Sequence, residues 1–191
     1  MTTDAYIKAN NRAIEVIAEI MQREGGFSSH PHDAGGATRF GVTEAVARAT
    51  GYRGAMRDLP KDSAQRILLR RYYFDPKFNR LDPLSPAISG ELTDTGINMG
   101  PLTACIYLQR ALNAFNQQGS RYRDLNIDGK VGNKTISALS AYLKYRGTAG
   151  EKVILKALNI LQGADYIAFS QSGDKKNESF VYGWLKNRVS L

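Results

Sequence analysis

Apolar side chains recur three and four positions apart along most of this chain, which is typical of amphipathic helices. Between Ala5 and Arg23 such a face consists of Ile7, Ala13, Ile14, Val16, Ile17, Ile20 and Met21. Gly25 is placed to end this helix. The next residues, 25–41, are rich in Gly, Ser, His, Pro and Asp, and they predict a loop or a short hairpin.

The rest of the chain continues the helical pattern, and almost no stretch alternates apolar and polar residues over five positions. We therefore expect a mainly α fold. Thr43 opens a helix over 44–49, and Asp62 or Ser63 caps another that Asp75-Pro76 stops. Further helices are predicted through Ile88, Leu92 and Ile97, over 102–116, from Asn133 or Thr135 through Leu143, and over 151–169, with polar loops at 119–132 and 170–177.

The Gly100-Pro101 break suggests a hinge between two halves, which we place at residues 1–101 and 102–191. A chain of 191 residues is long enough for one large domain or two small ones. Cys105 is the only cysteine, so it forms no internal disulfide, and its apolar neighbours favour a buried bystander over a nucleophile.

Charge and composition limit the possible classes of binding partner only in part. The chain has 26 Lys and Arg against 18 Asp and Glu, a net charge of +8, which favours a nucleic acid, an anionic membrane face or a bacterial wall. A solvated basic surface explains the same count, and no nucleic-acid recognition motif is present, so we expect no nucleic-acid partner. Neither a secretory signal nor a run of ~20 apolar residues is visible, and we expect a soluble monomer without its own export route.

Glu24 has the most informative setting for chemistry. It stands at the predicted end of a helix, where unpaired carbonyls disfavour an ionised carboxylate, and Phe27 nearby would add desolvation. Both effects raise a carboxyl pKa, as a general acid near neutral pH requires. The alternative is a glutamate that simply ends an exposed helix, but Gly25-Gly26 and the polar residues downstream favour the catalytic interpretation.

Asp33 and Thr38 follow Glu24 closely. In a glycosidase an ionised Asp33 could position water or stabilise oxocarbenium charge, and Thr38 could hold the same water. An Asx turn for Asp33 and a backbone hydrogen bond for Thr38 are the structural alternatives. His30 and His32 lie two residues apart, but no third strong ligand follows them, so we expect neither a metal nor another cofactor.

At these residues the chain resembles glycoside hydrolase family 108, a group of N-acetylmuramidases that includes phage endolysins and proteins once labelled secretion activators. The resemblance covers nearly the whole chain, although the family more usually has Tyr-Trp where this chain has Tyr72-Tyr73. The second half is similar to the peptidoglycan-binding domain that accompanies the family. The similar segments are 24–27, 33–43, 72–76 and 94–101 in the first half, and 108–113, 128–132 and 183–188 in the second.

The resemblance implies a lysozyme-like helical catalytic domain over 1–101, followed by a small helical peptidoglycan-binding domain over 102–191. It also implies cleavage of the β-1,4 bond between N-acetylmuramic acid and N-acetylglucosamine, with Glu24 as the catalytic acid. Only Glu24 carries over firmly; the likeness of Glu24, Asp33 and Thr38 to the Glu-Asp-Thr set of phage-type lysozymes is looser.

Such a bacteriolytic, antimicrobial endolysin of a bacteriophage would be made in the host cytoplasm and would reach the periplasmic wall after holin-type release. Two alternatives stay open. One is a lytic transglycosylase, which also uses a single Glu. The other is a non-catalytic wall-binding or secretion-assisting protein.

Several further residues have two interpretations each. Phe27, Tyr73 and Asn98 are candidate substrate contacts, but Tyr73 could equally pack in the core and Asn98 could cap a helix end. The Asp124–Gly129 run matches the start of an EF-hand, yet position 12 would be Thr135, so a turn is favoured over calcium. The segment 180–188 mixes aromatic and basic residues; it could touch an anionic outer membrane, or dock on the C-terminal helices with its tryptophan in the core.

Overall fold

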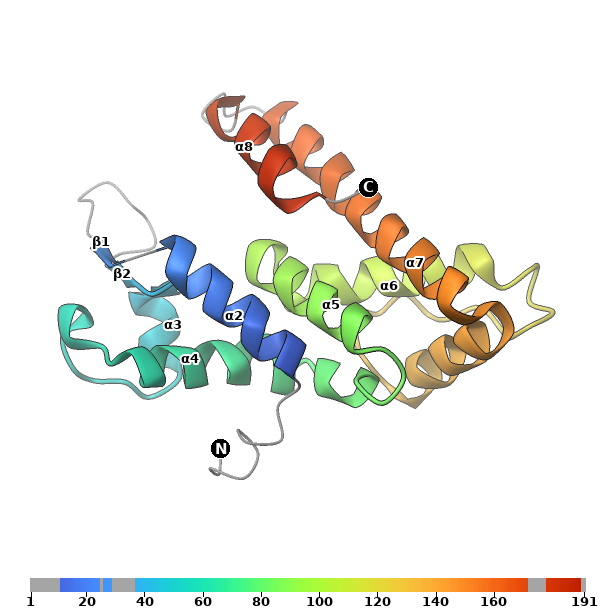
Figure 1. Cartoon of the computed structure of the whole chain (residues 1–191), viewed down its shortest axis with the longest axis horizontal. Helices are drawn as coiled ribbons and strands as arrows, with labels where there is room; N and C mark the ends of the chain where they lie inside the picture. Colours follow the sequence, from blue (N-terminus) through green and yellow to red (C-terminus); the bar gives the residue numbers. More distant parts are fainter. Residues whose placement is uncertain (1–10, 25, 29–36, 172–177, 190–191) are drawn as a thin grey trace.

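The structure is a computed structural model that describes residues 11–24, 26–28, 37–171 and 178–189. Helices dominate it, as expected, and the described strands form one small antiparallel sheet in the order β1-β2-β3 (Figure 1). None of the helices in these ranges has both the length and the apolar character needed to cross a membrane. The elements are α2 (Asn11–Glu24), β1 (Phe27–Ser28), β2 (Thr38–Arg39), β3 (Val42–Thr43), α3 (Glu44–Ala49), η1 (Met56–Asp58), α4 (Lys61–Leu69), η2 (Arg70–Phe74), η3 (Phe78–Leu81), α5 (Pro86–Met99), α6 (Pro101–Phe115), α7 (Asn133–Gln171) and α8 (Glu178–Arg188).

Side-chain caps start two of the helices. The Thr43 hydroxyl accepts a hydrogen bond from the Val46 N–H at 3.4 Å and opens α3, as predicted. Ser85 does the same for α5, with Pro86 at the first helical position. The prediction that Asp62 or Ser63 caps α4 is wrong, because α4 begins at Lys61, directly after an extended Pro60. Pro60 has its φ fixed by the ring and its carbonyl accepts from the Ala64 N–H at 3.0 Å, so the first turn forms without a side-chain cap.

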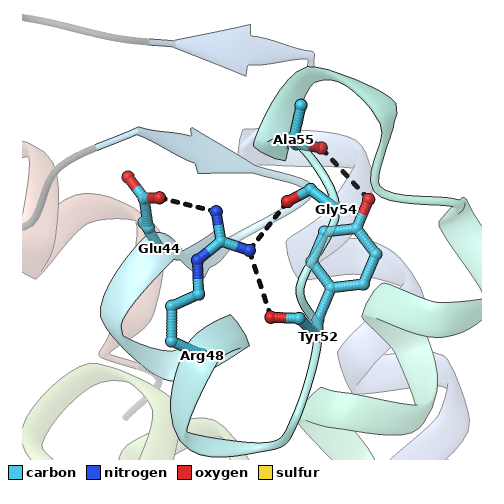
Figure 2. A network of polar contacts seen from close by, with 5 residues as sticks. All are labelled: Glu44, Arg48, Tyr52, Gly54 and Ala55. Carbon is cyan, nitrogen blue, oxygen red and sulfur yellow. Dashed lines mark hydrogen bonds and ion pairs between the residues drawn. The ribbon is translucent and has the colours of Figure 1, made fainter.

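Arg48 fastens the loop that follows α3 (Figure 2). Its guanidinium donates to the Glu44 carboxylate at 2.7 Å and to the backbone carbonyls of Tyr52 and Gly54 at 3.1 and 2.7 Å. The Tyr52 hydroxyl donates in turn to the Ala55 carbonyl at 3.0 Å. One charged side chain thus satisfies carbonyls that no regular element pairs, and it fixes the path towards η1 and α4.

Gln109, in α6, holds the loop between α6 and α7 from inside the protein. Its side chain is almost fully buried. Its amide nitrogen lies 2.8 Å from Asp128 Oδ1 and 3.2 Å from the Lys130 carbonyl, and its amide oxygen accepts from the Gly129 N–H at 2.9 Å. The two segments 108–113 and 128–132 are therefore one structural unit, and Asp128 serves this turn.

Two further amides, Asn113 in α6 and Asn116 directly after it, hold the same loop. The side chain of Asn113 pairs with both backbone groups of Leu125, donating to its carbonyl at 2.9 Å and accepting from its N–H at 2.7 Å. Asn116 accepts from the Gly119 N–H at 3.0 Å. Since these positions follow Gln109 by four and seven residues, one face of α6 organises a loop with no regular structure of its own.

The two halves of the chain pack against one another around a continuous core. Helix α5 contacts α6 and α7 across the junction. The expected break at Gly100 is present, with a φ of 90°, but a free hinge there does not fit the bonding between α5 and α7. Three side-chain pairs join α5 and its N-cap residue to α7: Ser85 with Glu151 at 2.5 Å, Glu91 with Asn159 at 3.0 Å, and Thr95 with Gln162 at 3.1 Å.

Two helical segments, predicted separately, meet directly in α7. The junction is Gly147, whose φ of 59° and ψ of −151° are not helical. The α8 helix then folds back beside the end of α7 (Figure 1). Cys105 in α6 is 1% exposed, and burial raises the pKa of its thiol to about 12, which agrees with its prediction as a bystander.

Candidate functional site

Glu24 is the last residue of α2, so its backbone lies where the helix gives way to the sheet (Figure 1). Three residues later β1 begins, and β1 pairs with β2 in the register Phe27 with Arg39 and Ser28 with Thr38. Asp33 lies in the segment between these strands, outside the described residues, as do His30 and His32. The fold therefore brings Thr38 back beside the strand that directly follows Glu24.

Thr38 occupies the middle of a row of three hydroxyl residues. It pairs with Ser28 on one side and with Thr43 on the other. Paired residues of adjacent strands project on the same face, about 5 Å apart. The opposite face contains Val42, which is fully buried. The hydroxyl row is thus the face turned away from that core residue, and Thr38 is half-buried within it.

The turn between β2 and β3 sets this register. Phe40 and Gly41 both have positive φ, at 52° and 75°, which is the conformation of a two-residue hairpin with a mirror-image turn. The Arg39 guanidinium lies 5.0 Å from the Phe40 ring centroid and covers it. The expectation of a short hairpin within 25–41 is confirmed for the residues described there.

Phe27 lies in β1 and remains 45% exposed. The guanidinium of Arg57, from η1, lies 5.9 Å from the Phe27 ring centroid. This aromatic ring, three residues from Glu24 in sequence, is accessible, but Phe27 pairs with Arg39 and therefore projects from the sheet face opposite to Thr38. Its role as a substrate contact stays a prediction.

Tyr73 does not have such access. It is fully buried, its hydroxyl donates to the Asp82 carboxylate, and its ring meets that of Phe74 edge-on at 4.8 Å. The interpretation of Tyr73 as a sugar-stacking residue does not fit this burial, and packing in the core is the role that the structure shows. The cause is local: η2 is one wide helical turn in which the Asp75 N–H bonds to the Arg70 carbonyl, a change of phase that the sequence pattern does not display.

Asn98 lies in the last turn of α5, half-buried, with both ends of its amide engaged. Its nitrogen donates to the carbonyl and the carboxylate of Asp94, at 3.0 and 3.1 Å, and its oxygen accepts from Arg188 of α8. Gly100 next to it is open, whereas a side chain at Gly96 would contact Phe78. Asn98 therefore ties the end of α5 to α8.

The aromatic residues of α8 dock on α7. Trp184 lies 5.2 Å from Tyr166 and 6.0 Å from Phe180 between ring centroids. No residue of α8 in the described range is buried, so Trp184 rests on the surface of the helices and not within the core. Trp184, Tyr166, Asn98 and Arg188 line a hollow of about 140 Å³.

A second hollow, of about 300 Å³, was not anticipated from the sequence. Helices α2, α5, α7 and α8 all contribute to it, and we name it the charged cleft. Its local sequence signal, Glu91 and Asp94 on one turn of α5, is visible only once the partner helices are known. Its charged and amide residues include Arg12, Glu19, Glu91, Asp94, Asn159 and Arg188.

Comparison with known proteins separates the chain into two parts. Residues 17–100 match the family described as glycosyl hydrolase 108, and residues 103–189 match a family described as a predicted peptidoglycan domain. Among solved structures the chain is similar to SagA of Brucella abortus, with 24% identity, a TM-score of 0.67, and coverage of 94% of this chain and 91% of that one. This likeness shows a shared fold. No curated protein matches the chain.

Proposed function

Residues 17–100 belong to the glycosyl hydrolase 108 family and residues 103–189 to a peptidoglycan-binding domain, and from this premise we propose that the chain is an N-acetylmuramidase. Membership makes it a glycoside hydrolase directed at peptidoglycan. The proposed bond is the β-1,4 linkage between N-acetylmuramic acid and N-acetylglucosamine. The observation that carries the proposal is the Glu-Gly-Gly-Phe segment at the end of α2, inside the matched residues.

In the proposed mechanism Glu24 protonates the glycosidic oxygen as the leaving sugar departs. A carboxylic acid is required there because an alkoxide is a poor leaving group at neutral pH. Thr38, in the hydroxyl row beside β1, holds the water that attacks the anomeric carbon, and Asp33 activates that water or stabilises the developing positive charge. Phe27 offers an apolar face to a sugar ring.

The cellular role that we propose is that of a phage endolysin acting on the bacterial wall. The net charge of +8 supports it, because the wall carries anionic polymers. We further propose that the chain acts as a monomer and reaches the wall by holin-type release. Co-expression with and without a holin tests this: lysis in both cases would reject the release step.

A digest of purified peptidoglycan tests the catalytic assignment. Wild type, Glu24→Gln and the matched control Glu178→Gln, an exposed residue at the start of α8, are incubated with sacculi, and the products are analysed by mass spectrometry. We expect N-acetylmuramic acid at the new reducing ends for wild type and control, and a rate reduced at least about 1,000-fold for Glu24→Gln.

Four outcomes would contradict the proposal in different ways. Anhydromuramic ends would identify a lytic transglycosylase, and N-acetylglucosamine at the reducing ends would identify cleavage of the other glycan bond. Equal rates for wild type and Glu24→Gln would reject Glu24 as the acid. Co-sedimentation with sacculi without any cleavage by wild type would identify a binding protein.

A further inference from the structure

The charged cleft lies outside the residues assigned to catalysis, yet its position links the two halves of the chain. The α2 helix, which ends at Glu24, supplies Arg12 and Glu19 to one wall, and α8 supplies Asn187 and Arg188 to another. An α-helix rises about 1.5 Å per residue, so the backbone of Glu24 lies about 7.5 Å farther along α2 than that of Glu19. This offset is about the length of one or two sugar rings.

Close packing between α2 and α5 shapes the floor of the charged cleft. A Cβ atom added at Gly90 would lie 2.6 Å from Cγ of Arg12, so the absence of a side chain at Gly90 lets the stem of Arg12 cross α5. The guanidinium of Arg12 reaches Glu15 at 3.4 Å and Glu19 at 3.6 Å, and the side chain remains 48% exposed. Its charge is thus positioned and accessible.

The opposite charge comes from α5. Glu91 accepts a hydrogen bond from Asn159 at 3.0 Å. Burial, together with the nearby carboxylate of Asp94, raises the pKa of Glu91 to about 7, against the opposing effects of Asn159 and Arg12. Near neutral pH this carboxyl group can therefore serve as a donor or as an acceptor.

A line of polar contacts continues from Asp94 to the far wall. Asp94 accepts from the amide of Asn98, and Asn98 accepts from Arg188. Carboxylates, guanidinium groups and amides therefore face one hollow of about 300 Å³ from four helices. A ligand that carries both signs of charge together with amide groups satisfies such a lining, whereas a purely anionic or purely cationic ligand would face like charges.

Peptidoglycan contains one component with that chemistry. Its glycan strand consists of N-acetylated sugars without charge, while the peptide attached to each muramic unit carries carboxylates, amides and, at its diamino acid, an amine. We propose that the charged cleft binds the peptide stem of a muramic unit next to the cleaved bond. This inference rests on the proposed function and adds a determinant of substrate choice to it.

Two substrates that differ only in the stem test the inference. One is intact sacculi, and the other is glycan strands from which an amidase has removed the peptides. We expect wild type to have a kcat/KM at least about tenfold higher on the peptide-bearing substrate. Arg12→Gln and Glu91→Gln should each reduce this ratio about fivefold or more, and the exposed controls Arg53→Gln and Glu178→Gln should leave it unchanged.

Each result separates the inference from the function on which it rests. If wild type cleaves both substrates with equal kcat/KM, the stem subsite is rejected while the hydrolase stands. If it cleaves neither, the proposed function fails. Equal losses of Arg12→Gln or Glu91→Gln on both substrates would show a general structural effect and overturn the subsite.

A binding measurement provides a readout independent of turnover. A synthetic stem tripeptide ending in a diamino acid is titrated into Glu24→Gln, with and without Arg12→Gln, by calorimetry. We expect binding that weakens about fivefold or more when Arg12 is replaced. Absence of binding to Glu24→Gln, or unchanged affinity in the double variant, would overturn the inference.

Discussion

Glu91 is a residue whose protonation is coupled to folding. Its carboxyl pKa is about 7 in the folded protein and near its ordinary value of 4.5 once unfolded. A carboxyl group with a raised folded pKa stabilises the protein below the unfolded pKa, and this stability is lost as pH rises through the folded pKa. The relevant interval is therefore about pH 4.5 to 7.

We predict that Glu91→Gln removes this pH-dependent loss of stability. Relative to wild type, the free energy of unfolding of the variant should rise between pH 4.5 and pH 8 by at most about 3 kcal/mol, because the amide does not ionise. Urea unfolding at both pH values measures it. A constant difference between the two proteins would show that Glu91 does not titrate in this interval.

Thr38 provides a second test at the residue scale, because its hydroxyl can be removed without disturbing the strand. Thr38→Val keeps a β-branched side chain in the middle strand, so stability should change by less than about 0.5 kcal/mol. The rate of sacculus cleavage should fall about 10- to 100-fold if the hydroxyl holds the attacking water. Thr38→Ser should restore most of the rate, and equal rates for Val and Thr would exclude the role.

At the scale of elements, the buried face of α6 holds the loop 117–132 in one conformation. Replacing Gln109 by Met keeps its volume but removes the acceptor of the buried-side Gly129 N–H bond and one donor to Asp128. The Lys130 carbonyl also loses this donor but still accepts from the Gly132 N–H and the Thr135 hydroxyl. We predict a loss of about 3 kcal/mol in the free energy of unfolding, measured by urea denaturation. Gln171→Met, at the exposed end of α7, is the control. A cost below about 1 kcal/mol would show that water replaces these bonds.

The same scale separates what the sequence could predict from what it could not. Thr43 acts on an amide three residues away, and this local signal predicts where α3 begins. Ser85 makes the same bond at the start of α5, although this start was not predicted. The contacts of Gln109 join residues about twenty positions apart, so its spacing on the helix does not reveal them. The burial of Tyr73 depends on the wide turn η2, which shifts the helical phase without a marker in the pattern.

Some residues of the candidate site could likewise be predicted from the sequence, and others could not. Glu24 and Thr38 could be proposed because glycine-rich punctuation and residue chemistry are visible along the chain. The charged cleft could not, because Glu91 and Asn159 are 68 residues apart and meet only when α5 packs on α7. Arg188, in turn, reaches Asn98 across 90 residues.

For the whole molecule, the shared core makes the first half dependent on the second. Thr95 and Gln162 are both buried and hydrogen-bonded to one another, and α5 packs on α6 and α7. We predict that residues 1–101 alone lack a cooperative urea transition, whereas the full chain shows one, as followed by circular dichroism. An isolated first half that unfolds cooperatively at the same urea midpoint would refute this dependence.

The burial of Cys105 has a practical consequence for experiments that follow unfolding. With 1% of its surface accessible and no second cysteine in the chain, this thiol can react with a coloured disulfide reagent only after α6 has separated from its neighbours. With reagent in excess, the rate at which colour appears would equal the rate at which α6 separates from its neighbours. The native thiol therefore reports the rate of unfolding, and no probe has to be introduced into the protein.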